Sequence, residues 1–555
     1  MHAVVPLRTV LTRRSLFSSA VFGAFIAAAG CDGTSSGSAP GSPDSGDSRV
    51  DAAVGDASNA STDASSQSQV DVGADTGLVD ASIQSDASDA ASGDTNADAA
   101  AALDVNASAF DANAIDSSSM DANQGDTDGA TSSALQRSPS GGWSTASGDP
   151  NNPTSGVIAA YGDGVVIAGA SSDPSMAGLA QFPEAGTYSE AFLRRIAHDG
   201  TPLWSVPLSA TGTPKGIGVD PSGNIIVTAP QPPPTTTVTT YSGGQAFYLG
   251  KFTSFGSAVF EKQIILPGLG SNDGSFPAGL AVDSTGASYV TGSLTYDTGA
   301  QGVFLYKADP TGAEVWSKMI QGDTNGAEMV GAAVAAVAQD EVVIGGSFEG
   351  HADFGGGQLF SEPDGGFIAP GFVVRYAPDG GYVSSAIFMG YSGFSQSSAL
   401  AAATGTDVLV SGMVEGAASV GGIALTGDAT LGSAFIARLG RNGTASWATL
   451  IAGAPPSSEA YSIAVDALGR AHVAGALGGS LVVADYDSSD GGALPNLTAQ
   501  VSDAGSGVMG ISQAIDSTQS LWISGSFDTS ATFGNITLSG TSAGVFLVRI
   551  DPGGP

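Results

Sequence analysis

The stretch AGLAVDSTGASYVTGSLTYDTGAQGVFLYKADPTGAEVWSKMI, residues 278–320, contains four short apolar runs separated by turn signals. The tight turns stand at 284–286 and 310–312, and a longer connection lies between the second and third runs. Short runs rich in β-branched and aromatic residues, bounded by Gly, Pro and Asp, are typical of strands. The stretch therefore predicts four antiparallel strands.

The same pattern recurs along the chain at a spacing of roughly 50–66 residues, a period typical of propeller blades. The endings of the second strands recur seven times, at 167–170, 227–229, 290–293, 344–347, 410–413, 473–476 and 523–526. The third strands also recur seven times, at 192–196, 247–251, 304–307, 372–376, 435–439, 481–485 and 546–550. We therefore predict an all-β fold, a seven-bladed β-propeller of four-stranded antiparallel blades.

The fourth strands show how the ring closes. They carry Trp204, Trp316 and Trp447, with Phe260, Val383 and the stretch 497–501 standing in elsewhere. The seventh unit ends without a fourth strand, and Trp143-Ser144-Thr145 resembles the missing one. We expect this N-terminal strand to pair with the last third strand, because closure removes exposed sheet edges. The propeller is then predicted to span residues 141–555.

Two further features belong to the repeat. A glycine follows most second strands, which indicates a tight bend or a close backbone approach. The Trp and Phe positions of the fourth strands indicate packing between blades. The sixth unit differs from the others because it lacks the long loop between Ala476 and Leu481.

Residues 1–30 have the layout of an export signal. Arg8, Arg13 and Arg14 precede an apolar run that ends in small residues, directly before Cys31. The run is short for a membrane-spanning helix. The stretch resembles a bacterial lipoprotein signal, which implies that Cys31 is lipidated and anchors the chain. Arg13 and Arg14 fit both a twin-arginine signal and an ordinary positive region, so the export route is left open.

Residues 31–140 are composed mainly of Asp, Ala, Ser, Gly, Thr and Asn, with nineteen Asp and two Arg. Large apolar residues are too few to offset the entropy of ordering, so we predict a disordered acidic tether. Its random-coil span is on the order of 55–60 Å. Calcium binding by the spaced Asp is disfavoured, because a calcium site needs rigid convergence of oxygen ligands.

The net charge of -36 argues against a nucleic-acid partner, which would require clustered Lys and Arg. The one Cys makes an intramolecular disulfide impossible.

Several units resemble the seven-bladed propeller repeats of bacterial cell-surface proteins and lipoproteins. Stretches 216–224 and 279–286 carry the shorter form of this repeat. The longer form, at 346–357 and again at 525–534, is similar to repeats in secreted proteins of myxobacteria-like organisms. The resemblance covers nearly all of residues 141–555 and implies the architecture rather than a function.

The sequence shows no catalytic set. His198, His351 and His472 lie in different units, and no pair has metal-ligand spacing. We expect His198 in a turn and His472 as a packed or rim side chain. The stretch 485–491 is faintly similar to a calcium loop but lacks the distal Glu, and a wide turn explains it better. The turns at 199–204 and 309–316 look similar to tryptophan-docking turns of quinoprotein propellers, and we interpret them as blade packing.

We therefore predict a lipid-anchored, exported, non-enzymatic binding or scaffold module at the cell envelope. The predicted partners are the membrane, through the lipid, and an unidentified protein or glycan. No cofactor or metal is expected, and the chain is expected to be monomeric. One alternative is a periplasmic lipoprotein resembling outer-membrane assembly factors. Another is a carbohydrate-active or quinoprotein-like enzyme, whose mark would be acidic and aromatic side chains converging on the channel mouth.

Overall fold

The computed structural model describes residues 141–146 and 156–552, except 172–189, 211, 232–245, 271–272, 323–327, 362–368, 391–394, 430, 452–457, 478–479, 495–498, 501–508, 528–529, 534–535 and 540–543. The predicted signal peptide (1–30), Cys31 and the rest of the predicted tether (31–140) lie outside the described residues. Within the described part, no helix has the length and apolar character needed to cross a membrane.

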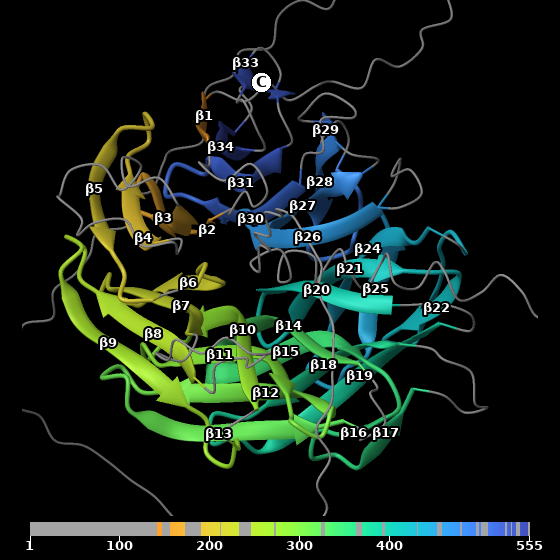
Figure 1. Cartoon of the computed structure of the whole chain (residues 1–555). Coiled ribbons are helices and arrows are strands. Elements are labelled where there is room, and N and C mark those ends of the chain that lie inside the picture. Colours follow the sequence, from red (N-terminus) through yellow and green to blue (C-terminus); the bar gives the residue numbers. More distant parts are fainter. Residues whose placement is uncertain are drawn as a thin grey trace, which may run out of the picture. The chain divides into compact units, whose positions relative to one another are not determined.

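The described strands form seven antiparallel blades in a ring (Figure 1). Blades 1 to 3 consist of β2 (Val157–Tyr161), β3 (Gly164–Ser171), β4 (Glu190–Ile196) and β5 (Pro202–Pro207); β6 (Gly216–Val219), β7 (Ile225–Gln231), β8 (Ala246–Phe252) and β9 (Ala258–Ile265); and β10 (Gly274–Val282), β11 (Ser288–Thr295), β12 (Gln301–Ala308) and β13 (Glu314–Gln321). Blades 4 and 5 consist of β14 (Met329–Val337), β15 (Glu341–Phe348), β18 (Gly371–Tyr376) and β19 (Tyr382–Gly390); and β20 (Ser395–Ala402), β21 (Val408–Val414), β24 (Ser433–Leu439) and β25 (Ala445–Leu450). Blades 6 and 7 consist of β26 (Ser458–Val465), β27 (Arg470–Leu477), β28 (Ser480–Asp487) and β29 (Ala499–Gln500); and β30 (Met509–Ile515), β31 (Leu521–Phe527), β34 (Gly544–Ile550) and β1 (Gly141–Ala146).

The ring closes as predicted. Strand β1 pairs with β34 and is the fourth strand of blade 7. In blade 3, Trp316 lies opposite Lys307 of the third strand. The equivalent of Lys307 in β34 is Arg549, which pairs with Gly141. Trp143 lies two residues further along, opposite Leu547. The all-β seven-bladed architecture is thus confirmed, and the detailed match of Trp143 to Trp316 was wrong.

First strands of neighbouring blades contact one another and form the inner wall of the ring (Figure 1), and we call the axis that they surround the channel. Because the strands are antiparallel, the ring has two distinct faces. The first-to-second and third-to-fourth turns lie on one, which we call the turn face. The second-to-third and fourth-to-first connections lie on the other, the loop face. The chain before Gly141 joins β1 at the turn face, next to the end of β34.

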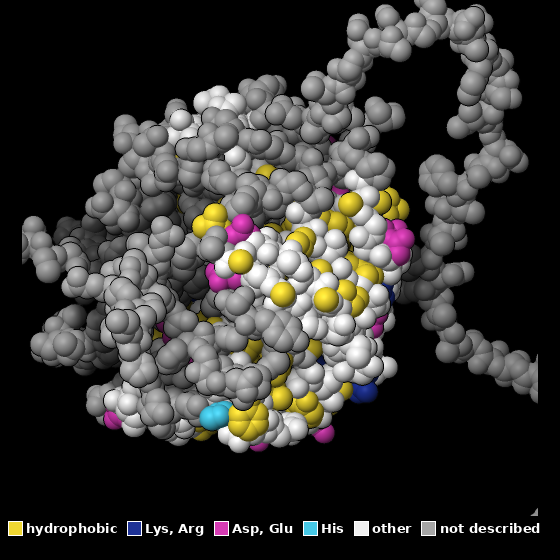
Figure 2. Space-filling model, turned by 90° about the vertical axis from the view of Figure 1, so that its right-hand side faces the viewer, with side chains coloured by type: hydrophobic (Ala, Val, Ile, Leu, Met, Phe, Trp, Pro, Cys, Tyr) yellow, Lys and Arg dark blue, Asp and Glu magenta, His cyan; other side chains and the backbone are white. Residues whose placement is uncertain are grey.

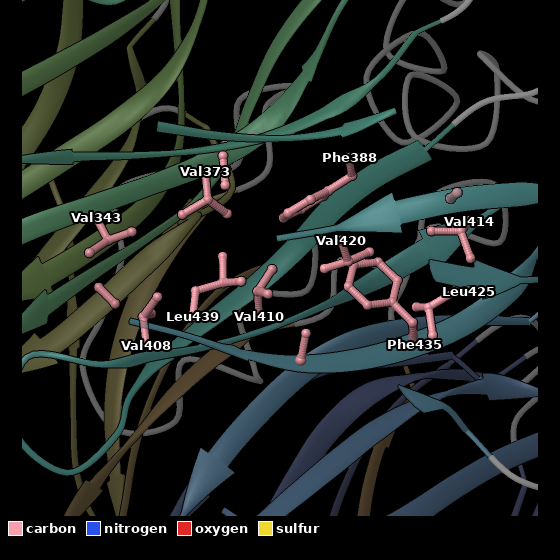
Figure 3. Packing of buried hydrophobic residues seen from close by; sticks show 14 of the residues in the cluster. Val343, Val373, Phe388, Val408, Val410, Val414, Val420, Leu425, Phe435 and Leu439 are labelled. Carbon is pink, nitrogen blue, oxygen red and sulfur yellow. The ribbon is translucent and has the colours of Figure 1, made fainter. Parts of the chain in front are cut away.

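The core is divided into clusters that lie between neighbouring blades. The cluster joining blades 4 and 5 is shown in Figure 3, where Phe388 of β19 and Phe435 of β24 point toward one another. Their ring centroids are 5.7 Å apart in an edge-to-face arrangement. Burying each such ring stabilises the fold by roughly 1.5–3 kcal/mol. Blade-to-blade packing is therefore the main source of stability.

Three second-to-third connections form hairpins that the sequence did not predict. They are β16 (His351–Asp353) with β17 (Gln358–Phe360), β22 (Ala417–Val420) with β23 (Ile423–Thr426), and β32 (Ser530–Phe533) with β33 (Ile536–Ser539). The blade 5 hairpin extends the sheet of blade 4, because Ser419 pairs with Met389 of β19. In blade 6 only residues 478–479 separate β27 from β28, which confirms the predicted short connection.

The fourth-strand tryptophans dock on the next blade, as predicted. Trp316 donates its indole N–H to the Pro378 carbonyl at 2.9 Å, and its ring lies against Gly380. Trp204 and Trp447 make the same contacts with the turns at Ser254 and Ser488. These turn glycines have positive φ (85° at Gly380), a conformation that glycine adopts without steric cost.

The assignment of Val383 to the tryptophan position was wrong. A bulge in β19 places Ser384, not Val383, opposite Arg375, at the position that Trp316 holds opposite Lys307. Ser384 donates its hydroxyl to the Arg441 carbonyl at 2.6 Å. A hydroxyl thus replaces the indole N–H as donor to the next blade.

Candidate functional site: the central channel

The histidines singled out from the sequence have structural surroundings. His198 lies in a turn, as predicted, and its carbonyl accepts a hydrogen bond from Arg549. His351 lies in β16 with its ring against Phe360. His472 is a packed residue, as predicted, with 5% of its surface exposed. The structure does not bring these three residues together, and among the described residues no group of His, Cys, Asp and Glu could hold a metal ion.

His472 lies where blade 6 departs from a contact that links neighbouring blades. In this contact a cationic side chain of the third strand donates a hydrogen bond to the third-to-fourth turn of the next blade, as Lys251 does to the Pro310 carbonyl at 2.9 Å. Blade 7 has no such continuous turn, since its third and fourth strands come from opposite ends of the chain. Blade 6 carries Asp485 at this position, and Asp485 lies 2.7 Å from Nδ1 of His472 in its own blade. Because ring closure leaves blade 7 without a continuous third-to-fourth turn, Asp485 pairs with His472 inside blade 6 instead of a cation reaching the next blade.

The stretch 485–491 is the wide turn expected from the sequence. Asp487 Oδ1 accepts the backbone N–H and hydroxyl of Ser489, at 2.8 and 2.6 Å. Gly491 lies against the Trp447 ring. Asp487 and Asp490 therefore serve the turn, whereas Asp485 lies in β28 and pairs with His472.

The channel holds a feature that the sequence analysis missed. In five blades the first strand carries a β-bulge at the same level, and the extra residues are Ala278, Ala332, Ser398, Tyr461 and Ile511. Lys215 of blade 2 holds the equivalent place. Its backbone N–H donates a hydrogen bond to the carbonyl of Thr228, and Thr228 pairs with Gly216, the residue that follows Lys215. We call these six residues the channel ring.

Several members of the channel ring are partly buried. Ala332, Ser398 and Tyr461 are each half-buried between two fully buried neighbours, and Lys215 is half-buried between Pro214 and Gly216. Bulges commonly redirect a side chain.

The recurring glycine lies within the second strand rather than after it, and there it accommodates the bulge of the first strand. A Cβ on Gly346 would meet the backbone carbonyl of Val330, and one on Gly412 would meet that of Gln396. Gly292 and Gly475 are in the same situation. The predicted close backbone approach is confirmed, and its cause is the bulge in the first strand.

Polar groups converge where blades 5 and 6 meet the channel. Glu459 of β26 accepts a hydrogen bond from the Ser398 hydroxyl at 2.8 Å, and its carboxyl is also hydrogen-bonded to Tyr461. Burial raises the pKa of the Glu459 carboxyl, although the two hydrogen bonds act in the opposite direction. Burial and the neighbouring carboxylate also raise the pKa of Tyr461. This corner of the channel is polar but poorly solvated.

Lys215 lies on another side of the ring, in blade 2, at the same level. It stands five residues before Asp220, just as Tyr461 stands five residues before Asp466. Burial lowers the pKa of its amine. This constant spacing of five residues before the turn aspartate is a sequence signal by which the channel ring can be identified, once the bulge is known.

The comparisons with known proteins show the fold alone. No family model and no curated protein matches the chain. A streptogramin B lyase structure is 10% identical with a TM-score of 0.36, and covers 73% of this chain and 97% of its own. YCF48 bound to D1 peptide is 10% identical with a TM-score of 0.37, and covers 74% and 96%. A protein of unknown function from Dyadobacter fermentans is 9% identical with a TM-score of 0.37, and covers 74% and 98%.

Such low identities assign no family. The resemblance to surface-protein repeats and to lipoprotein signals therefore stays a prediction.

Proposed function

We propose that the chain is an exported, lipid-anchored binding module whose ligand enters the central channel. Cys31 is the proposed anchor, residues 32–140 are the proposed spacer, and the propeller is the binding unit. The observation that carries the proposal is the channel ring. Bulges at one level of the first strands bring Ser398 and Tyr461 to the carboxyl of Glu459, where blades 5 and 6 meet, and the backbone of Lys215 holds the same level in blade 2. Concave sites with a few convergent polar groups are typical of ligand-binding sites.

One side of the ring offers few charged groups to a ligand. On the side of the ring shown in Figure 2, charged side chains are sparse among apolar and uncharged ones. The chain before Gly141 joins the propeller at the turn face, so the proposed anchor is connected to the ring at that face.

A screen of glycans, peptides and small metabolites tests the binding function. The full chain is compared with Ala332→Trp, which fills the channel at the level of the ring, and with Glu314→Gln on the outer strand β13 as control. A ligand bound by the native chain and by the control, but not by Ala332→Trp, supports the proposal. Equal binding by all three chains contradicts a channel site.

Anchoring is tested separately. Cys31→Ala should release the chain from the membrane fraction, because this substitution removes the proposed site of lipidation. Retention in that fraction contradicts the anchor. Protease treatment of intact cells then distinguishes the two sides of the outer membrane, since degradation of the propeller would rule out a periplasmic location.

A channel enzyme is the second candidate, because an acidic and an aromatic side chain, Glu459 and Tyr461, do converge on the channel. Hydrolysis of a glycosidic bond ordinarily needs two carboxyl groups that flank the bond. The Ser398 hydroxyl and Tyr461 are both hydrogen-bonded to one carboxyl, that of Glu459. The cluster of Glu459, Ser398 and Tyr461 therefore favours ligand binding over glycoside hydrolysis.

A further inference from the structure

The acid beside each first-to-second turn has a permanently charged partner in blades 2 to 5. In these four blades the partner is a lysine or arginine of the third strand of the same blade. The pairs are Asp220–Lys251, Asp283–Lys307, Glu341–Arg375 and Asp407–Arg438, with N–O distances of 2.8, 3.8, 3.2 and 2.8 Å. Lys and Arg keep their charge at any pH near neutrality, so these four carboxylates always have a counter-ion.

Blade 7 uses a histidine of the next blade instead. Its acid at this turn is Asp516, whose side chain is fully buried, and Nδ1 of His198 in blade 1 lies 3.5 Å from Asp516 Oδ2. The third-strand cation Arg549 is directed elsewhere, since its Nε lies 2.8 Å from Asp551 Oδ1 and its guanidinium donates to the His198 carbonyl. Within the described part of the chain, the counter-ion of Asp516 is therefore a side chain that is charged only when it holds a second proton.

The charged groups around His198 come from both blades. Asp516 approaches from the turn between β30 and β31, and Asp199 is the neighbour of His198 in its own turn. Arg549 of β34 contacts the backbone of His198, and Asp551 pairs with Arg549. A positive charge on the imidazole therefore meets three carboxylates and one guanidinium.

The junction of blades 4 and 5 has the same contact with a permanent charge. Arg441 is the second residue of the third-to-fourth turn of blade 5, as His198 is in blade 1; in both turns the fourth residue donates its N–H to the first carbonyl. Nε of Arg441 lies 2.8 Å from Oε1 of Glu341 in blade 4. A cation at this place of the turn can thus link a blade to the one before it.

We propose that the junction of blades 7 and 1, which we call the seam, is a pH-sensitive joint that protonated His198 tightens by pairing with Asp516. Histidine side chains ordinarily change their charge between pH 5 and 8. Below this range the imidazolium compensates the buried carboxylate across the seam, and as the pH rises this attraction is lost. Neutral contacts remain, such as the hydrogen bond from the Ser517 N–H to the Gly162 carbonyl at 2.8 Å. The seam is also where the ring closes, since β1 pairs with β34 and leads into blade 1.

Hydrogen exchange of the full chain at pH 5.5 and pH 8 tests the proposal. The amide of Ser517 is the probe, because it donates across the seam. At pH 5.5 it should exchange about 2- to 5-fold more slowly in the native chain than in His198→Gln, the modest effect expected of a partly exposed ion pair. At pH 8 the two chains should exchange at the same rate. Comparing both chains at one pH removes the effect of pH on the exchange chemistry itself.

Three further variants assign the effect to this pair. His198→Arg carries a permanent charge and should exchange more slowly than His198→Gln at both pH values. Arg441→Gln removes the equivalent cation from another junction and should leave Ser517 as in the native chain. In a chain that carries Asp516→Asn, adding His198→Gln should no longer change the rate at pH 5.5.

Two results would overturn the proposal. One is a ratio between the native chain and His198→Gln that is the same at pH 5.5 and pH 8, because the seam would then not respond to the charge of His198. The other is an effect of His198→Gln that persists beside Asp516→Asn, because the charge would then act on a different group.

Discussion

At the scale of single residues, the recurring glycine of the second strand connects the sequence repeat to the bulge of the first strand. Gly346 is required because the bulge in β14 brings the carbonyl of Val330 against it, and Ala332 is the extra residue of that bulge. The repeated glycine therefore marks the level of the bulge in the blade that carries it.

Gly346→Ala should lower the free energy of unfolding by about 1–3 kcal/mol, since the new Cβ overlaps backbone that cannot move freely. Urea denaturation of the full chain measures this change. Gly440→Ala is the control, because its Cβ would first meet the Asn442 side chain at an ordinary 3.4 Å. An equal effect in both variants would show that the bulge is not the cause.

The buried pair of Lys251 and Asp220 is a second residue-scale feature. Nζ of Lys251 lies 2.8 Å from Asp220 Oδ2, and the two residues are 5% and 6% exposed. Burial alone would raise the pKa of Asp220, but hydrogen bonds from Lys251 and Asn224 and the Lys251 charge hold it below its ordinary value. This stabilisation is present above the ordinary carboxyl pKa and is lost as the pH falls through the lowered value.

Lys251→Met should destabilise the fold by about 3–5 kcal/mol near neutral pH, because it leaves Asp220 buried without its counter-ion. The loss of stability on acidification should be smaller in this variant. Unfolding free energies measured from pH 2.5 to 7 test both points. Lys251→Met with Asp220→Asn should recover part of the loss, and no recovery would contradict the ion-pair argument.

Glu459 should show the opposite dependence on pH. Its folded pKa is raised above the ordinary value of 4.5, so the folded chain holds a proton that the unfolded chain releases. Stability therefore falls as the pH rises from about 4.5 toward the raised value. Relative to Glu459→Gln, the native chain should lose stability across this window. A pH-independent difference between the two chains would contradict the raised pKa.

At the scale of elements, the fourth strands explain why blade 6 differs from its neighbours. A fourth-strand tryptophan needs a third-to-fourth turn on the next blade for its indole N–H and its ring. Trp447 of blade 5 finds one at Ser488 and Gly491. Blade 7 lacks a continuous turn, and in the part of the chain that the structure describes the fourth strand of blade 6 spans Ala499–Gln500.

Trp447→Ala should cost about 3–5 kcal/mol, since Trp447 is 8% exposed and its removal leaves a cavity between blades 5 and 6. Ser384→Ala, at the equivalent position of blade 4, should cost only about 1 kcal/mol, the value of one hydrogen bond. Thermal unfolding of both variants measures the difference. Similar losses would show that the two positions are not equivalent in the way the register indicates.

The strands and their order could be predicted because blade strands alternate with turns whose Gly, Pro and Asp are visible in the sequence. Register could not. The tryptophan position falls on Ser384, four residues after Gly380, just as Trp316 is four residues after Gly312. A separate bulge in β26 concealed Tyr461 among ordinary strand residues. The partner of Glu459 lies sixty-one residues away in Ser398, so the corner of the channel appears only when two blades are placed side by side.

At the scale of the whole molecule, the ring depends on strands from both ends of the chain. Blades 1 to 6 are each continuous in sequence, and blade 7 alone joins β1 to β34, through six residue pairs from Gly141–Arg549 to Ala146–Gly544. Without β1, the outer edge of β34 would be exposed, and exposed edges favour pairing with other chains.

Deleting residues 141–146 should therefore open the ring without removing any complete blade. The loss of six paired residues is expected to lower the free energy of unfolding by on the order of 3–6 kcal/mol. The free edge should also make the chain associate as its concentration rises, which analytical ultracentrifugation detects. Deleting residues 121–126, six residues of the predicted tether, is the matched control and should change neither quantity. If the chain lacking β1 stayed monomeric with native stability, closure by the N-terminal strand would contribute nothing to the fold, and the stability of the ring would have to come from blade-to-blade packing alone.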